Sequence, residues 1–368
     1  MVHRDTPDHA TLDDVARAAG VSRATAARAL GGYGSASPAA RERVLAAAAV
    51  LRYRPNALAR SMKSGSTRTL GVVVSDIQLA FFAQAVRGIA DAAREEDFEV
   101  ILANTDENLA LERAAVGVLV EKRVDGLIVV PSEPGEASHL VEAQERGIPV
   151  VLFDRGSPGV RCDVVVVDNH RAAKNAVRHL VRLGHRRVAI VVEARTALPA
   201  AAALRSRLPA DGGMTSPLRE VGWAAALREA GISVTDDLIC GAEYERDDAR
   251  RATARALALP ERPTAFVTTD ETMTLGAIDA IQDAGLEIPR DISLVAFDDL
   301  PWTTLVRPPL TVVAQPVLEL GRTATQRLLS RVGGFDGPPE TLVLSTSFVV
   351  RGSTGPAPGA HTVTFGRP

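Results

Sequence analysis

The spacing of apolar residues divides the chain near residue 69. Between residues 11 and 51, apolar positions recur with the period of a helix in three short runs, and residues 55–64 predict one further short helix. Beyond a Gly-Ser-Thr joint, short runs rich in Val, Ile and Leu alternate with longer amphipathic runs. The short runs predict strands at 69–75, 98–103, 126–130, 149–153, 163–167, 187–192, 264–268, 292–297 and 341–350. The amphipathic runs predict helices at 80–96, 107–122, 135–146, 168–183, 218–230, 247–258, 270–284 and 316–331.

The predicted strands are mostly apolar throughout and do not alternate. This pattern is typical of parallel strands whose two faces are both covered by helices. The repeated order of strand, helix and strand therefore predicts an α/β fold with two open, doubly wound parallel sheets. Two segments fall outside the pattern: residues 194–213 are expected to form a loop insertion, and residues 352–368 a loose tail.

Composition agrees with two or three globular domains. The chain has 368 residues, of which 46% are hydrophobic and 24% charged. It contains no apolar run of the ~18 residues that a membrane span requires. Its first residues lack the apolar stretch of a secretory signal, so we expect a cytoplasmic protein without membrane contact. Its two cysteines, Cys162 and Cys240, are too few for a disulfide framework.

Charge is distributed unevenly along the chain. The formal net charge is −3, but residues 1–68 contain 11 Lys and Arg against 5 Asp and Glu, and the remainder is acidic. A basic head on an acidic body indicates that only the head meets a polyanion.

Residues 11–30, TLDDVARAAGVSRATAARAL, have the pattern of two helices joined by a tight turn. Thr11 is a good N-cap for the first helix, and Gly20 can adopt the left-handed conformation that the turn needs. Ser22 then caps a second helix with two contrasting faces. Its apolar face comprises Ala26, Ala29 and Leu30. Its opposite face comprises Arg23, Ala24, Ala27 and Arg28.

This arrangement predicts a helix-turn-helix motif, whose second helix can enter the major groove of DNA with its N-terminal residues at base edges. The pattern alone also fits a plain αα-hairpin within a larger fold. A third helix is expected from Ser37 and Pro38, with an apolar face of Val44, Leu45, Ala48 and Leu51.

The stretch 11–65 resembles the head and hinge of the lactose-repressor (LacI/GalR) family, including the YRPN junction at residues 53–56. The resemblance implies that Arg23 and Ala24 face bases and that Thr25 and Arg28 contact phosphates and bases. The other DNA contacts that it implies are Thr11, Ser22, Ala27, Tyr53, Asn56, Ala59 and Met62.

The hinge, residues 55–64, is too short to be helical alone in water. In the family, two hinge helices pair in the minor groove and a leucine wedges between bases, and Met62 occupies the matching position here. The head also departs from the family. Ala26 and Ala27 replace the usual Val and Ser, and Arg52 replaces a glycine. The head therefore predicts DNA binding but not a particular operator sequence.

The remainder, about residues 69–354, resembles the effector domain of the same family and hence the periplasmic sugar-binding proteins. Segments such as DGLIVVPSE, GIPVVLFDR and LVAFDDL carry the resemblance in register. It implies two subdomains with a ligand in the cleft between them, at the carboxyl ends of the strands.

The strand-end rule selects ligand candidates without the family. Asp76, Asp154, Asp270 and Asp298 each follow a predicted strand. Charged groups bond hydroxyls strongly, and aromatic faces cover the apolar side of a sugar. With the resemblance, the predicted effector site comprises Phe81, Phe82, Asp154, Arg155, Arg219, Asp270, Asp298 and Gln315. The plainer interpretation of each Asp is a helix N-cap.

Departures in the core bear on the ligand. Leu79 and Ala80 replace the family's Asn-Pro, and Thr269 replaces a common Asn. The effector therefore need not be a simple pentose or hexose. His179 and His185 invite a metal interpretation, but they flank a helix end and the turn at Gly184 that recur in the family, so we expect neither metal nor cofactor.

The predicted organisation is a helix-turn-helix domain at 1–54, a hinge and linker at 55–68, a sensing core at 69–355 and a flexible tail at 356–368. The predicted function is a homodimeric repressor that binds double-stranded operator DNA and a small-molecule effector, expected to be a carbohydrate. A sugar-binding transport protein is the main alternative. An enzyme is disfavoured because no glycine-rich phosphate loop, G-x-S-x-G elbow or metal-ligand cluster is present.

Overall fold

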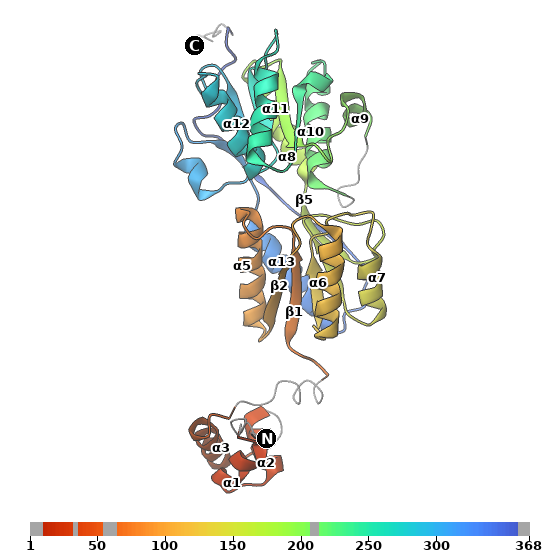
Figure 1. Ribbon diagram of the computed structural model, residues 1–368, viewed down its shortest axis with the longest axis vertical. Coiled ribbons are helices and arrows are strands. Elements are labelled where there is room, and N and C mark those ends of the chain that lie inside the picture. The colour runs from red at the N-terminus through yellow and green to blue at the C-terminus, as the bar shows by residue number, and fades with distance from the viewer. Residues whose placement is uncertain (1–9, 32–35, 54–64, 207–212, 360–368) are drawn as a thin grey trace, which may run out of the picture. The chain divides into compact units, whose positions relative to one another are not determined.

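The computed structural model describes residues 10–31, 36–53, 65–206 and 213–359. The chain divides into two compact units, Met1–Thr69 and Leu70–Pro368, here termed the head and the core (Figure 1). The described part of the head consists of three helices, α1 (Leu12–Ala19), α2 (Arg23–Gly31) and α3 (Pro38–Val50).

Local chemistry explains where the head helices begin and end. The Thr11 hydroxyl accepts from the Asp14 amide while the Asp14 carboxylate accepts from the Thr11 amide, which makes a capping box for α1. Gly20 ends α1 with a φ of 63°, a conformation that glycine adopts without strain. Ser37 caps α3, and Pro38 occupies its first turn.

Small side chains fill the centre of the head. The buried members of this cluster are Val15, Ala16, Ala19, Ala26, Ala29, Val44 and Ala48. Alanines let the three helices approach closely but remove little apolar area from water. The predicted apolar face of α3 is wrong in one position, because Leu45 is 50% exposed and Ala40 is buried instead.

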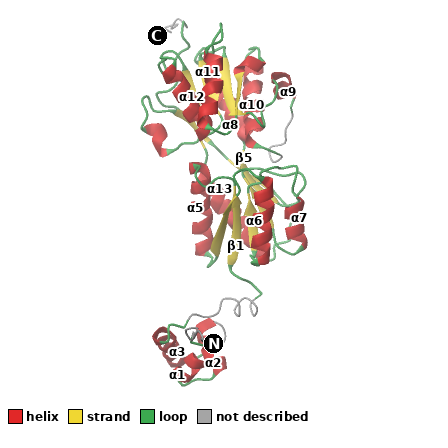
Figure 2. Cartoon of the chain, viewed as in Figure 1, coloured by secondary structure: helices red, strands yellow, loops and turns green. Residues whose placement is uncertain are grey.

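The core contains two six-stranded sheets, each covered by helices (Figure 2). The first sheet has the order β11-β5-β4-β3-β1-β2. Its strands are β1 (Thr69–Val74), β2 (Glu99–Asn104), β3 (Gly126–Val129), β4 (Val150–Phe153), β5 (Asp163–Val167) and β11 (Thr341–Leu344). Its helices are α5 (Ala80–Glu95), α6 (Leu109–Glu121), α7 (Ser138–Glu145) and α13 (Val317–Val332).

The second sheet has the order β12-β10-β9-β8-β6-β7. Its strands are β6 (Val188–Glu193), β7 (Ile239–Ala242), β8 (Ala265–Thr268), β9 (Ser293–Phe297), β10 (Thr311–Ala314) and β12 (Ser347–Val349). Its α-helices are α8 (Asn169–Arg182), α9 (Ala200–Arg205), α10 (Thr215–Glu229), α11 (Arg246–Leu257) and α12 (Glu271–Asp283). Two 3₁₀ turns, Asp236–Leu238 and Pro301–Thr304, complete it.

The predicted fold class is confirmed, since strands β11-β5-β4-β3-β1 and β10-β9-β8-β6-β7 pair in parallel, while β12 pairs antiparallel with β10. The chain passes between the subdomains three times, after β5, after β10 and after β11. Each crossing leaves the carboxyl end of a strand, so these ends face the boundary between the two sheets. Residues brought to this boundary can therefore serve one common site.

A single predicted strand at 341–350 is wrong. The structure has two strands there: β11 pairs with β5 in the first sheet, and β12 pairs with β10 in the second. Alternating apolar residues mark extended backbone but carry no information on which sheet a strand joins. The short strands β7 and β10 were not predicted, and prolines on both sides of β10 obscured it.

Two predicted loops are more ordered than expected. The insertion at 194–213 contains α9. Residues 352–357 do not form a loose tail: the Ser353 hydroxyl donates to the Leu294 carbonyl, and the Ala357 amide donates to the Leu183 carbonyl. A Gly- and Pro-rich sequence therefore packs as a strap across the second subdomain.

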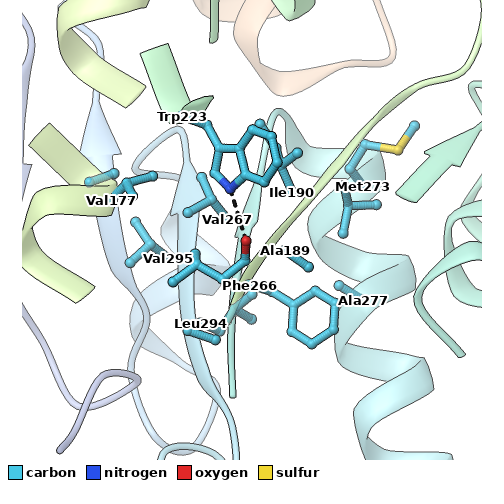
Figure 3. Close-up of a cluster of buried hydrophobic side chains, with 14 of the residues drawn as sticks. Val177, Ala189, Ile190, Trp223, Phe266, Val267, Met273, Ala277, Leu294 and Val295 are labelled. Carbon is cyan, nitrogen blue, oxygen red and sulfur yellow. Dashed lines mark hydrogen bonds between the residues drawn. The ribbon is translucent and has the colours of Figure 1, made fainter. Parts of the chain in front are cut away.

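Large side chains fill the interior of the second subdomain. Trp223 of α10 is fully buried, and its indole nitrogen donates to the Val188 carbonyl at 3.0 Å (Figure 3). Phe266 and Met273 pack in the same cluster. None of the described helices is long and apolar enough to cross a membrane.

Candidate functional site

The outer face of α2 carries the residues predicted to meet DNA. Arg23 and Ala24 are exposed, and Ala27 and Arg28 are partly exposed, whereas Ala26 on the opposite face is fully buried. The Ser22 hydroxyl accepts from the Thr25 amide at 3.1 Å, which fixes the start of this helix. The structure thus places one basic, accessible face on the second helix of a helix-turn-helix unit.

Both arginines of this face hold weak partners on the head. Arg23 Nε lies 3.5 Å from a carboxylate oxygen of Asp13, and the two side chains are 70% and 53% exposed. Arg28 Nε donates to the Ala24 carbonyl at 3.2 Å. Exposed pairs of this kind contribute little stability, so both guanidinium groups can exchange these partners for a phosphate or a base at small cost.

Other predicted DNA contacts have structural roles in the head. The Thr11 hydroxyl belongs to the capping box of α1, and Tyr53 is half-buried against the alanine-rich cluster. Asn56, Ala59 and Met62 lie outside the described residues.

A cavity lies between the two sheets of the core, with about 550 Å³ of empty space counted to its open mouth. All eight residues predicted for the effector site line it. The complete lining is Leu79, Phe81, Phe82, Asp154, Arg155, Glu193, Thr215, Ser216, Arg219, Tyr244, Asp270, Glu271, Asp298 and Gln315.

Strand ends and helix starts deliver these side chains. Asp154 follows β4 and Asp298 follows β9, and both have a positive φ, of 64° and 73° respectively. Such backbone is uncommon outside glycine, and Asp tolerates it better than most residues. Gln315 follows β10, where the chain crosses between the subdomains.

Arg155 is held rigidly at the first-subdomain side of the cavity. Its two terminal nitrogens donate to the two carboxylate oxygens of Glu107, each at 2.7 Å, and the Arg155 residue is 8% exposed. Burial is the largest single influence and opposes ionisation of Glu107, but the charge and hydrogen bonds of Arg155, together with Ser75 and Arg195, outweigh it and lower the Glu107 pKa. Bidentate pairing of this kind fixes the guanidinium plane.

Arg219, on α10, is fixed from three directions. Its Nε donates to Asn169 Oδ1 at 2.8 Å, its Nη1 donates to the Thr269 carbonyl, and its guanidinium lies 4.1 Å from the centre of the Phe297 ring. Its Nη2 donates to none of the described residues, so this nitrogen remains available to a ligand.

Burial raises the pKa of three aspartates in the cavity. The pKa of Asp298 rises to about 6, although Arg219 and a hydrogen bond from Gln315 oppose the effect. Burial also raises the pKa of Asp154 and Asp270. Asp270 accepts from the Met273 amide, so it is also the N-cap that the plainer interpretation expects.

Six lining residues were not predicted. They are Leu79, Glu193, Thr215, Ser216, Tyr244 and Glu271. The strand-end rule would have found Glu193, which ends β6, and Tyr244, which follows the unpredicted β7. By contrast, Asp76 obeys the rule but lies outside the lining, and its carboxylate accepts from the Gln78 amide.

Two contacts join the subdomains across the mouth of the cavity. Arg195 donates to Glu107 at 3.5 Å and to Glu193 at 3.0 Å. Glu271 of α12 accepts from the Ala80 amide at the start of α5, at 3.5 Å, and from the Trp302 indole at 2.8 Å. Separation of the subdomains would break both contacts.

The histidines and cysteines have ordinary structural environments. His179 hydrogen-bonds Thr354, and His185 hydrogen-bonds Thr264 and Ser293. Burial raises the pKa of Cys162 and of Cys240 to about 12, which disfavours the reactive thiolate form of both. Within the described ranges, no group of three or more His, Cys, Asp and Glu residues is placed to hold a metal ion.

Comparison with known proteins assigns both units. Residues 11–56 match the family model of bacterial regulatory proteins, lacI family, and residues 177–354 match a periplasmic binding protein-like domain. Catabolite control protein A of Priestia megaterium is 36% identical over 87% of this chain and 92% of its own length. The lac repressor dimer bound to operator and the anti-inducer ONPF has a TM-score of 0.80, with 27% identity over 95% of this chain and 100% of that chain.

A third relative was solved with a sugar. The structure of a LacI family transcriptional regulator from Enterococcus faecium with bound ribose has a TM-score of 0.67 and 27% identity, over 78% of this chain and 99% of that chain.

The chain belongs to the LacI family of bacterial regulatory proteins. It is a DNA-binding transcriptional regulator with a core that binds a small-molecule effector, and its family consists of regulators rather than enzymes.

Proposed function

We propose that this chain is a homodimeric repressor whose two heads bind the halves of a near-palindromic operator. In each head, α2 enters the major groove. Arg23 and Ala24 then face base edges, while Ser22, Thr25, Ala27 and Arg28 complete the contact. The observation that carries this proposal is the single accessible face of α2 with two loosely held arginines.

The operator claim is tested by fluorescence anisotropy. The purified protein is titrated against near-palindromic fragments from its own genome and against scrambled DNA, at two salt concentrations. We expect nanomolar binding to one fragment and far weaker binding to scrambled DNA, as in other specific complexes. Weak binding that is equal on all sequences and lost at modest salt would contradict specific recognition.

The proposed effector is a carbohydrate or a related polyhydroxyl compound in the cavity between the subdomains. Buried carboxylates and Arg219 supply acceptors and a donor for hydroxyl groups, and Phe81 and Phe82 supply aromatic faces. The bound ribose of the Enterococcus faecium relative gives independent support.

Exposed apolar side chains on two neighbouring elements of the first subdomain, β2 and α6, support the homodimer. Ile101 and Leu102 on the edge strand β2 are 36% and 38% exposed, and Leu111 and Val118 on α6 are 46% and 50% exposed. A second copy of this chain would cover these side chains. Leu111→Glu is expected to convert the dimer to a monomer in sedimentation velocity, whereas Val350→Glu, at another exposed apolar position, should not.

Effector and operator are coupled through the cavity. Closure of the subdomains around a ligand would change the separation of the two hinges, residues 55–64, and thereby their stability on DNA. Coupling of this kind is typically worth about 1–3 kcal/mol and is reciprocal. We expect an inducer, so a ligand that occupies the cavity should weaken operator binding in the anisotropy assay.

A further inference from the structure

The cavity contains more acidic than basic side chains. Its acidic residues are Asp154, Glu193, Asp270, Glu271 and Asp298. Its basic residues are Arg155 and Arg219. With all of these ionised, the lining has an excess of negative charge in a site where burial weakens screening by solvent.

The two arginines compensate only part of this excess, because they face five carboxylates of the lining and Arg155 is also paired with a sixth. Arg155 gives both terminal nitrogens to Glu107, a carboxylate outside the lining. Arg219 gives Nε and Nη1 to Asn169 and to the Thr269 carbonyl, which leaves Nη2 as its available donor.

Several carboxylate oxygens, in contrast, have no partner. Asp154 is 8% exposed, yet its side chain accepts no hydrogen bond from the described residues, and its closest cationic atom is Arg155 Nε at 3.7 Å. Asp298 uses Oδ1 to accept from Gln315, and Glu193 uses Oε1 to accept from Arg195. Their second oxygens accept nothing from the described part of the chain.

We propose that the natural effector is a polyhydroxyl compound with a protonated amino group, such as an amino sugar. This inference rests on the proposed function of the cavity as the effector site. An ammonium group brings three donors, no acceptor and a positive charge, which matches the carboxylate oxygens of Asp154, Glu193 and Asp298 that accept no hydrogen bond from the described residues. Phe81 and Phe82 also line the cavity, and aromatic rings can attract a cation.

Other ligand classes fit these atoms less well. A phosphorylated or carboxylated ligand would add acceptors and negative charge to a site that already has both in excess. A neutral sugar would satisfy carboxylate oxygens with hydroxyl donors, but it would leave the charge of the lining uncompensated.

The test is calorimetric titration of the full-length protein with matched sets of sugars at neutral pH. Each set contains an amino sugar (D-glucosamine, D-galactosamine or D-mannosamine), its N-acetyl derivative and the parent hexose. We expect at least one amine to bind about tenfold more tightly than both of its neutral counterparts. Equal or tighter binding of the neutral member in every set would overturn the proposal, and so would a failure of all three amines to bind.

A variant that removes one negative charge tests whether Asp154 accounts for the tighter binding of the amine. Asp154→Asn preserves the shape of the side chain and is expected to reduce amine affinity by about tenfold, with a smaller effect on the parent hexose. Glu261→Gln removes a carboxylate that is 83% exposed and should leave all affinities unchanged. Thermal unfolding of both variants checks that they are folded. Full amine affinity in Asp154→Asn would contradict the assigned contact.

The outcomes separate this proposal from the function on which it rests. If a parent hexose binds, is weakened by Asp154→Asn and changes operator affinity, the cavity is the effector site and only the amine claim fails. If no sugar of any set binds or alters operator affinity, the proposed carbohydrate effector fails as well.

Discussion

The head and the core use arginine in opposite ways. In the head, the Arg23 side chain is 70% exposed, and its Nε lies 3.5 Å from a carboxylate oxygen of Asp13. In the core, Arg219 is 5% exposed and is fixed by Asn169, the Thr269 carbonyl and the Phe297 ring. A surface that must match a large polyanion can leave its side chains free to adjust, whereas a cavity that selects one small ligand gains from donors fixed in advance.

The interiors of the two units differ in the size of the side chains that they bury. The head buries alanines and two valines, whereas the second subdomain buries Trp223, Phe266 and Phe297. Burial of large side chains gives the core most of its stability. The head therefore depends more on local features such as helix caps, and the same kind of substitution should have different effects in the two units.

Removal of the largest buried side chain is expected to have the largest effect. Trp223→Ala should destabilise the core by about 3–5 kcal/mol, because it creates a cavity and leaves the Val188 carbonyl without its donor. Urea unfolding followed by circular dichroism measures the change. Trp223→Phe keeps an aromatic ring and should cost less. A loss below ~1 kcal/mol for the alanine variant would show that this cluster does not dominate core stability.

The core also contains buried carboxyl groups, and Glu220 is one of them. Glu220 is fully buried beside Arg219 on α10 and accepts from the Leu198 amide of the insertion. Burial raises its pKa from 4.5 to about 7, and the hydrogen bond from Leu198 opposes this rise only partly. The folded state thus binds this proton more tightly than the unfolded state, so Glu220 destabilises the fold increasingly as pH rises from about 4.5 to 7.

Glu220→Gln should therefore stabilise the core by about 1–3 kcal/mol above pH 7, with little effect near pH 4.5. Urea unfolding across this pH range measures the difference between variant and parent. Glu261→Gln, at an exposed position, serves as the control and should show no gain that grows with pH. A constant difference at every pH would mean that Glu220 does not titrate in this range.

The sequence predicted some features of the core and missed others. Apolar runs identified both parallel sheets. Strand-end positions, together with the family resemblance, identified eight of the lining residues, because the carboxyl ends of parallel strands meet at one edge. Contacts made by the insertion were not predictable: Arg195 and Leu198 meet Glu107 and Glu220 only through the fold. The sheet change between β11 and β12 was missed for the same reason, since strand partners are set by tertiary packing.

Base recognition by the head is expected to depend on Arg23 without a matching effect on stability. Arg23→Ala should lose about 1–3 kcal/mol of discrimination at one base pair, as expected when a bidentate contact to guanine is removed. Anisotropy titrations against the operator and its single-base variants measure the preference. Arg41→Ala removes an exposed charge from α3 and should at most weaken all sites equally. An unchanged base preference in Arg23→Ala would exclude it as a reader of bases.

The smallest expected effect concerns the cap of α1. Thr11→Ala removes the hydroxyl that bonds Asp14 at 2.6 Å and should destabilise the head by about 1 kcal/mol. Amide hydrogen exchange along α1 in the full-length chain measures this loss locally.

The family resemblance also places Thr11 near DNA, and two further variants separate the capping role from a DNA contact. Thr11→Ser keeps the hydroxyl and should preserve both exchange protection and operator affinity. Thr11→Asp keeps a capping oxygen but adds negative charge, so it should retain most protection and lose operator affinity only if this position faces a phosphate. Unchanged exchange in Thr11→Ala would mean that packing against α3, and not the capping box, holds the start of α1.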